Sequence, residues 1–187
     1  SLTNEAAILA ARENRLKVSQ YDLIRSLEKV MLGPERKSHI LSDHEKNITA
    51  YHEAGHALVA SVLPNADPVH KVSIIARGHA GGYTLSLPLE EKRLLSKKSF
   101  VDRLAMILGG YAAEQEIFGD ITTGPSSDLQ IASALARDMV ARYGMSSKIG
   151  PVAFHDDGVH ATAGGMIVEG KEYSEKIAAT IDEEVKS

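Results

Sequence analysis

Cysteine and tryptophan are absent from this chain of 187 residues, and aromatic residues make up only 5% of it. Without cysteine the chain can form no disulfide, no cysteine-based zinc site, no iron–sulfur cluster and no thiol nucleophile. Any metal site must therefore use His, Asp and Glu side chains. Long apolar runs are absent too, because no stretch of 18 or more apolar residues occurs. These residues therefore predict no membrane-spanning helix.

Excess positive charge is lacking as well. The chain has 21 Lys and Arg residues against 25 Asp and Glu residues, which gives a net charge of −4. This balance provides no basic surface for nucleic acid, so we expect no nucleic-acid partner. Residues 1–5 lack the basic-then-apolar pattern of a secretory signal, and they read as the start of a segment cut from a longer protein.

Hydrophobic periodicity predicts a mainly α-helical protein with a small β-sheet. Apolar residues recur every three to four positions in most of the chain, and they alternate with polar residues in two short segments. We expect two helices within residues 3–32, further helices at 42–63, 99–118, 126–143 and 173–185, and a hairpin of strands at 69–76 and 82–87. The Gly-rich segment 144–171 has no periodic pattern, and we expect it to be a long loop.

The sharpest feature is the motif His-Glu-Ala-Gly-His at residues 52–56. On a helix, residues four apart lie on one face about one turn apart, so both imidazoles reach one zinc ion. Glu53 lies beside that face, and we expect it to act as the general base on a zinc-activated water. The alternative is a pair of surface histidines. The small and apolar neighbours at 57–63 disfavour it, because they indicate a helix buried on much of its circumference.

A catalytic zinc site uses three protein ligands and leaves one position open. No His-x-x-Gly-x-x-His pattern follows the motif, which excludes the three-histidine arrangement of metzincins. The third ligand is therefore expected to be a distant carboxylate. The other histidines stand in linker, strand-edge or loop contexts and are expected to be solvated; they are His39, His44, His70, His79, His155 and His160.

Two carboxylates are candidates for the third ligand. A helical wheel of residues 100–118 places Glu114 within the apolar face, where a carboxylate needs a metal, a ligand histidine or a cation as partner. Gly109 and Gly110 in the same helix permit close approach of a neighbouring element. Asp128 follows a loop rich in Thr and Ser, but capping and the helix dipole also explain an aspartate in a first helical turn. Residue chemistry leaves both candidates open, with a slight preference for Glu114.

An ordered set of segments resembles the protease domain of the FtsH-type family, the membrane-anchored, ATP-dependent zinc metalloproteases. The segments extend over nearly the whole chain and are residues 49–57, 68–75, 108–114, 123–129 and 136–140. The His-Glu-x-x-His motif alone is shared by many peptidases, whereas the ordered set is specific to this family.

The resemblance implies roles for individual residues. It makes Asp128 the third zinc ligand beside His52 and His56. It makes Glu114 a residue that orients a ligand histidine from behind. On this point the resemblance overrides the slight preference for Glu114 as a ligand.

The resemblance also divides the chain. It implies that residues 1–33 are the C-terminal end of the helical lid of an AAA+ ATPase module and that residues 34–41 are a linker. Residues 42–187 are then a helical zinc-metallopeptidase domain that lacks its final C-terminal part. No Gly-x-x-x-x-Gly-Lys motif followed by Ser or Thr occurs, so ATP and Mg²⁺ are expected only in an ATPase module outside this chain.

The implied function is zinc-dependent endopeptidase activity in protein quality control, on membrane and soluble polypeptides. The family also implies a homo-hexamer held by an N-terminal anchor at a membrane. That membrane is expected to be a bacterial inner membrane with this domain facing the cytoplasm, or an organelle membrane. One alternative is a free-standing metallopeptidase, which the lid-like residues 1–33 disfavour. Another is an inactive zinc-binding interaction module, which the intact Glu53 disfavours.

Substrate binding is predicted at the strand 82–87. This strand is short, begins with glycine and is followed by proline, which are features of an edge strand with a free backbone. A peptide can add to such an edge as an extra strand. We therefore expect Gly82, Tyr83, Thr84 and Leu85 to contact an extended substrate beside the zinc. The alternative is a structural strand that covers the helical core.

Overall fold

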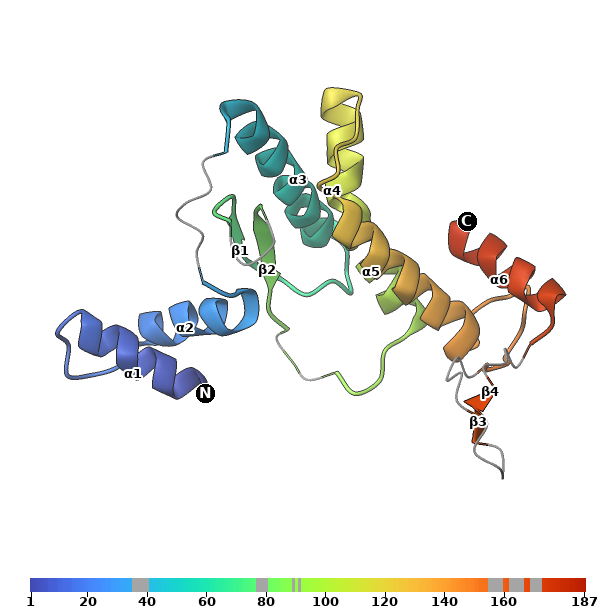
Figure 1. Cartoon of the computed structure of the whole chain (residues 1–187), viewed down its shortest axis with the longest axis horizontal. Helices are drawn as coiled ribbons and strands as arrows, with labels where there is room; N and C mark the ends of the chain where they lie inside the picture. The colour runs from blue at the N-terminus through green and yellow to red at the C-terminus, as the bar shows by residue number, and fades with distance from the viewer. Residues whose placement is uncertain are drawn as a thin grey trace.

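The computed structural model describes residues 1–34, 41–76, 81–88, 90, 92–154, 160–161, 167–168 and 173–187. Its elements in chain order are α1 (Leu2–Arg12), α2 (Gln20–Leu32), α3 (Asp43–Val62), β1 (Val69–Ser73), β2 (Tyr83–Ser86), α4 (Lys97–Phe118), α5 (Ser126–Arg137), a π-helical turn (Asp138–Arg142), β3 (His160–Ala161), β4 (Ile167–Val168) and α6 (Glu175–Lys186). Figure 1 shows α1 and α2 together near the N-terminus, apart from the α3, α4 and α5 helices. The predicted fold class, mainly helical with a small sheet, is confirmed.

The helices α1 and α2 form an N-terminal helical hairpin. The buried side chains of Ala6 and Ala10 are small, so α1 approaches α2 closely. At the start of α2 the Ser19 hydroxyl accepts a hydrogen bond from the Asp22 N–H at 3.4 Å, and the Asp22 carboxylate accepts one from the Ser19 N–H at 2.8 Å. This reciprocal capping box satisfies two free amides of the first helical turn.

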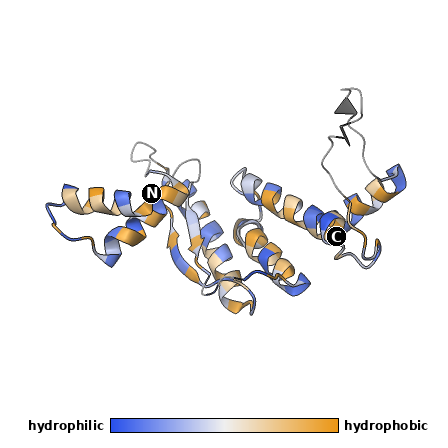
Figure 2. Ribbon diagram, turned by 90° about the horizontal axis from the view of Figure 1, so that it is seen from below, coloured by the Kyte–Doolittle hydropathy of each residue, from blue (hydrophilic) through white to orange (hydrophobic). Residues whose placement is uncertain are grey.

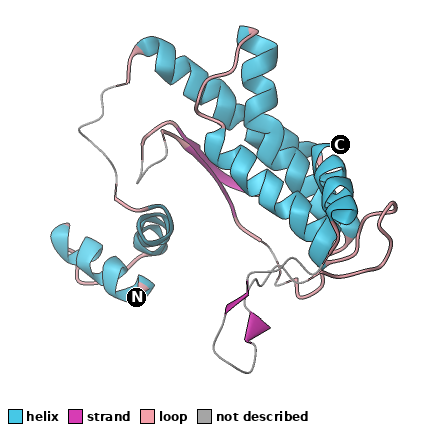
Figure 3. Ribbon diagram, turned by 45° about the vertical axis from the view of Figure 1, so that its right-hand side comes forward, coloured by secondary structure: helices cyan, strands magenta, loops and turns pink. Residues whose placement is uncertain are grey.

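The helices α3 and α4 lie side by side at the centre of the fold and cross at glycines (Figure 3). A Cβ atom on Gly55 of α3 would lie 2.3 Å from the carbonyl oxygen of Gly109 in α4. A Cβ atom on Gly110 would lie 2.5 Å from Cε1 of the His52 ring. A side chain at either position would push the two helices apart. The predicted close approach at Gly109 and Gly110 is confirmed.

The strands β1 and β2 pair in antiparallel orientation, as the sequence predicts. Val72 lies opposite Thr84, and Ser73 lies opposite Tyr83. Both strands contact α3. The hairpin therefore covers the helix that carries the His-Glu-x-x-His motif.

The predicted helix at 126–143 changes its hydrogen bonding in its last turn. It is α-helical as far as Arg137 and continues as the π-helical turn. In that turn the amide of Tyr143 donates to the carbonyl of Asp138 at 2.9 Å, which is the wider i→i+5 spacing. Apolar spacing does not distinguish these two kinds of helix over one turn.

The C-terminal helix α6 packs against α5 and the π-helical turn, with Ile181 fully buried. As Figure 2 shows, the helices carry both hydrophobic and hydrophilic residues around their circumference. Within the predicted loop 144–171, β3 and β4 pair in antiparallel orientation over two residues each. Strands of two residues are too short to leave a periodic pattern. None of the helices described is sufficiently long and apolar to cross a membrane.

Candidate metal centre

Two imidazole nitrogens and one carboxylate oxygen converge between α3 and α5. The Nε2 atoms of His52 and His56 are 3.1 Å apart. Oδ2 of Asp128, in the first turn of α5, lies 3.0 Å from Nε2 of His52 and 3.2 Å from Nε2 of His56. Ligand atoms 2.0–2.1 Å from a tetrahedral zinc ion lie about 3.3 Å from each other. The three donors are therefore spaced as the ligands of one zinc ion.

The outer nitrogens of both rings hydrogen-bond to acceptors, which fixes the tautomer of each imidazole. Nδ1 of His52 lies 2.8 Å from Oε1 of Glu114, and Nδ1 of His56 lies 2.8 Å from the carbonyl oxygen of Met106. Because a carboxylate and a carbonyl accept, these shorter contacts favour a hydrogen on each Nδ1, and in the neutral ring each Nε2 then presents a lone pair. Two lone pairs and a carboxylate oxygen that face one another require a cation among them, so this donor set fits Zn²⁺.

Without a metal ion, protons can neutralise the negative charge of this cluster, and the pKa values of His52, His56 and Asp128 reflect this. Burial favours neutral imidazoles, but hydrogen bonds to Asp128 outweigh it and raise the pKa of both His52 and His56. Burial also opposes ionisation of Asp128, yet the hydrogen bonds from the two rings hold the pKa of its carboxyl well below its ordinary value. Protons and a metal ion therefore compete for one negatively charged cluster.

Glu114 lies behind the His52 ring, on the side away from the three converging donors. Its side chain is only 1% exposed. Besides the contact with Nδ1 of His52, its Oε2 accepts hydrogen bonds from the Thr122 N–H at 3.0 Å and the Thr122 hydroxyl at 2.9 Å. The structure thus groups Asp128, not Glu114, with the two Nε2 atoms. The chemical preference for Glu114 as a ligand is not supported by this placement.

Glu53 is buried beside the two histidines, and its carboxylate is outside the group of three converging donors. Its Oε2 accepts a hydrogen bond from the Thr84 hydroxyl at 2.7 Å. Burial raises the pKa of Glu53, although the bond from Thr84 and the neighbouring histidines act in the opposite direction. A carboxylate with a raised pKa beside a metal site is suited to general-base chemistry.

The four residues predicted to bind substrate are Gly82, which immediately precedes β2, and three residues of the strand, and they divide between its two faces. Gly82 and Thr84 face Glu53, because a Cβ on Gly82 would lie 2.9 Å from Oε1 of Glu53. Tyr83 and Leu85 are 7% and 5% exposed, so their side chains belong to the core. Of the four residues, the structure thus brings the Thr84 side chain and the Gly82 backbone to the site.

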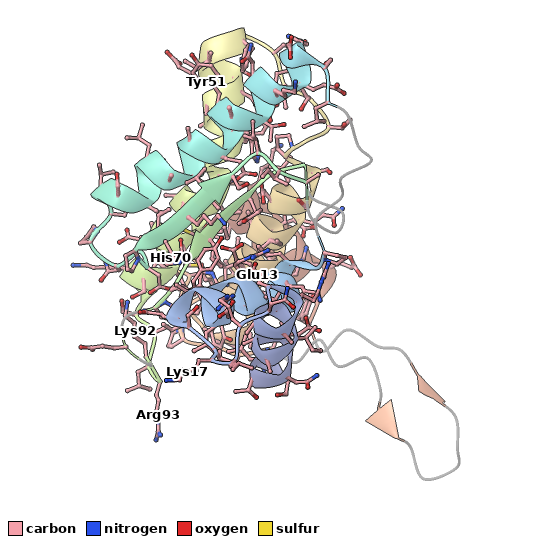
Figure 4. The ribbon with its side chains drawn as sticks, turned by 90° about the vertical axis from the view of Figure 1, so that its left-hand side faces the viewer. Glu13, Lys17, Tyr51, His70, Lys92 and Arg93 are labelled. Atoms are coloured by element: carbon pink, nitrogen blue, oxygen red, sulfur yellow. The ribbon has the colours of Figure 1, made fainter. Side chains whose placement is uncertain are left out.

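The other histidines do not join this cluster in the described part of the chain. His44 and His70 are exposed, as predicted. Figure 4 shows His70 at the level of the hairpin, below the α3 segment that carries Tyr51. His39, His79 and His155 lie outside the described residues, and only the backbone of His160 is described, within β3.

Sequence reasoning missed three contacts that complete the site. They are the Thr84 hydroxyl on Glu53, the Thr122 hydroxyl on Glu114 and the Met106 carbonyl on His56. A threonine in a strand or loop carries no distinctive signal, and a backbone carbonyl carries none at all. The one sequence feature that points to the Met106 contact is its position four residues before Gly110, where the predicted helix 99–118 can closely approach a neighbour.

Comparisons with known proteins agree with this geometry. The family model for peptidase family M41 matches residues 39–187. The "ATP-dependent zinc metalloprotease FtsH 1" of Sphaerobacter thermophilus is 51% identical over 187 residues, which are 100% of this chain and 29% of that protein. The "ATP-dependent zinc metalloprotease FtsH" of Thermotoga maritima is 49% identical over 187 residues, again 100% of this chain and 31% of that protein.

The chain thus spans less than a third of the length of these curated relatives. The family match covers the predicted metallopeptidase domain and the converging donors. The resemblance to the FtsH-type protease domain is confirmed, and this chain belongs to peptidase family M41.

Proposed function

We propose that this chain is the zinc-dependent endopeptidase domain of a longer, ATP-dependent protease. The observation that carries the proposal is the convergence of Nε2 of His52, Nε2 of His56 and Oδ2 of Asp128 within 3.2 Å of one another. These three residues hold Zn²⁺. When bound, the ion supplies a Lewis acid that makes water acidic and polarises a peptide carbonyl.

The remaining residues of the site orient the ligands and move protons. Glu114 and the Met106 carbonyl hold the two imidazoles with their Nε2 lone pairs directed at one point. Glu53 takes a proton from the attacking water and delivers it to the leaving amine. The pKa of Glu53 is raised toward neutral pH, and this makes its carboxylate a stronger base than that of an exposed glutamate.

Casein hydrolysis tests this assignment. Glu53→Gln keeps the shape of the side chain but cannot accept the proton, so we expect a loss of about 10²- to 10⁴-fold in kcat with zinc content unchanged. Glu116→Gln is the matched control, since Glu116 is an exposed glutamate of α4 and the variant should retain full activity. Chelator-sensitive casein cleavage also separates an enzyme from an inactive zinc-binding module. Normal activity in Glu53→Gln would refute the assigned base.

The substrate is proposed to add to the free edge of β2. β2 pairs with β1 on one edge, and among the described residues no strand lies on the other. The backbone of 82–85 then binds an extended peptide, which suits a protease that accepts many sequences. A complex with a peptide hydroxamate should show ladder hydrogen bonds to β2. An inhibitor bound elsewhere would leave β2 a purely structural strand.

The larger assembly is proposed from the relatives. Residues 1–33 form a helical hairpin that precedes the M41 match, which supports their assignment as the end of an ATPase lid, with 34–41 as linker. ATP and Mg²⁺ then belong to an ATPase module outside this chain. We assign the full protein to a homo-hexamer at a bacterial inner membrane, with this domain facing the cytoplasm and degrading membrane and soluble polypeptides. Sizing and fractionation of the full-length protein test these two points.

A further inference from the structure

We propose that Thr84 is a positioning residue that holds the carboxylate of Glu53 in its working orientation. This inference rests on the proposed function, because it assigns Glu53 as the base. It gives β2 a second task besides pairing with substrate. The strand fixes one oxygen of the base and leaves the other for proton transfer.

The first argument is the hydrogen bond itself. The Thr84 hydroxyl lies 2.7 Å from Oε2 of Glu53 and 3.1 Å from the Glu53 backbone carbonyl. A hydroxyl has one hydrogen to donate. The shorter contact and the negative charge of the carboxylate both favour donation to Oε2. Oε2 is therefore held from the side of the strand.

The second argument is that Thr84 is itself held firmly. As a β-branched residue it has restricted rotation about χ1. It is paired with Val72 in the hairpin, and its neighbours Tyr83 and Leu85 are both buried. The hydroxyl is thus fixed by the strand and does not depend on a flexible side chain.

The third argument concerns the other oxygen of Glu53. A Cβ on Gly82 would lie 2.9 Å from Oε1 of Glu53, so the absence of a side chain at Gly82 leaves room for that oxygen. Among the described residues no hydrogen bond reaches Oε1, whereas Oε2 is engaged by Thr84. The geometry therefore assigns the proton-carrying role to Oε1 and the anchoring role to Oε2.

Substitutions at Thr84 test the proposal. Thr84→Val preserves the shape of the side chain and removes the hydroxyl, and Thr84→Ala removes it without adding bulk. Loss of one hydrogen bond to a charged group predicts a fall in kcat of about 10- to 100-fold, with KM and zinc content unchanged. Thr84→Ser keeps the hydroxyl and should recover most of kcat. Thr180→Val, which removes a hydroxyl bond within α6, is the control and should behave as wild type.

The outcomes are distinguishable. Wild-type kcat in Thr84→Val or Thr84→Ala would overturn the positioning role, and so would a Thr84→Ser variant as inactive as either of them. A change confined to KM, or a fall in activity matched by lost zinc, would assign Thr84 to substrate binding or to structure instead. If Glu53→Gln is inactive while the Thr84 variants are normal, only this inference fails. If Glu53→Gln is active, the proposed function fails as well.

Discussion

Glu28 and Glu114 are both buried carboxylates, but their surroundings differ in one respect. Glu28 of α2 is 2% exposed, and Nζ of Lys71 donates to its two oxygens at 2.8 Å and 3.0 Å. The Tyr83 hydroxyl also lies 3.4 Å from Oε2 of Glu28. Glu114 is 1% exposed and accepts from His52 and Thr122, neither of which carries a permanent positive charge.

The difference separates a structural cluster from a metal-binding one. The Glu28 cluster contains the Lys71 ammonium group as a counter-charge for the buried carboxylate. This ion pair joins α2 to the hairpin. The cluster around Glu114 contains two further carboxylates, Glu53 and Asp128, beside imidazoles whose Nε2 lone pairs converge. Buried negative charge without a fixed cation is costly. This cluster must bind protons or a metal ion, whereas the Glu28 cluster needs neither.

The strongest test of this contrast removes carboxylates from the metal cluster. Asp128→Ala deletes a ligand atom, so zinc affinity should fall by more than about 100-fold. Glu114→Ala deletes only the group behind His52, and its effect should lie within about 10- to 100-fold. Competition with a chromogenic chelator measures both, and Glu28→Gln is the control with unchanged affinity. A larger loss in Glu114→Ala than in Asp128→Ala would make Glu114 the ligand.

A smaller effect, on the stability of the fold, is expected when the Lys71 cation beside Glu28 is removed. Lys71→Met removes the ammonium group that donates to the buried Glu28 carboxylate, but the Lys71 side chain is 42% exposed and solvent moderates the loss. We expect the free energy of unfolding to decrease by about 1–3 kcal/mol, with zinc affinity unchanged. The double variant Glu28→Gln/Lys71→Met should recover much of the loss.

The matched control for this change is Lys92→Met. The Lys92–Asp67 pair is 3.7 Å apart and exposed on both sides, so its loss should cost at most about 0.5 kcal/mol. Chemical denaturation of the zinc-loaded protein measures all three variants. An equal free energy of unfolding for Lys71→Met and Lys92→Met would show that the Glu28–Lys71 pair does not stabilise the contact between α2 and the hairpin.

The smallest predicted effect is on the pH dependence of zinc affinity, because zinc and protons compete for the same nitrogen atoms. Because the pKa of His52 and His56 is raised in the folded protein, the metal-free cluster binds protons more tightly than the unfolded chain does. The stability contributed by these protons is present at low pH and is lost as pH rises through the folded-state pKa. Zinc must expel the same protons, so its affinity should fall as pH falls through that range.

Calorimetry in buffers of different ionisation enthalpy measures this proton release. Release on zinc binding should increase as pH decreases toward the folded-state pKa. His44→Ala should not change it, since His44 is exposed and outside the cluster. Zinc binding with no proton release at any pH would contradict the competition between protons and metal.

Sequence reasoning places much of the site because helical spacing is a local property. The motif at 52–56 fixes two donors on one face of α3, and a helical wheel identifies Glu114 as buried. Gly109 and Gly110 indicate a close helix crossing. These inferences need no knowledge of how elements far apart in the chain approach one another.

The remaining features depend on that approach. Whether Glu114 or Asp128 meets the Nε2 atoms depends on which side of the His52 ring each carboxylate reaches, and only the packing of α4 and α5 on α3 decides it. Residue chemistry therefore left the choice open. The contact of Thr84 with Glu53 depends on the hairpin lying over α3, which periodicity within the strand does not indicate.

Anomalous scattering at the zinc edge tests the central claim most directly, because it locates the metal and its ligands together. Crystals grown with zinc should give one strong anomalous peak per chain. The zinc ion at this peak should be coordinated by Nε2 of His52, Nε2 of His56 and the carboxylate of Asp128. Glu114 should remain hydrogen-bonded to Nδ1 of His52. A peak coordinated by Glu114, or no peak between α3 and α5, would contradict the account.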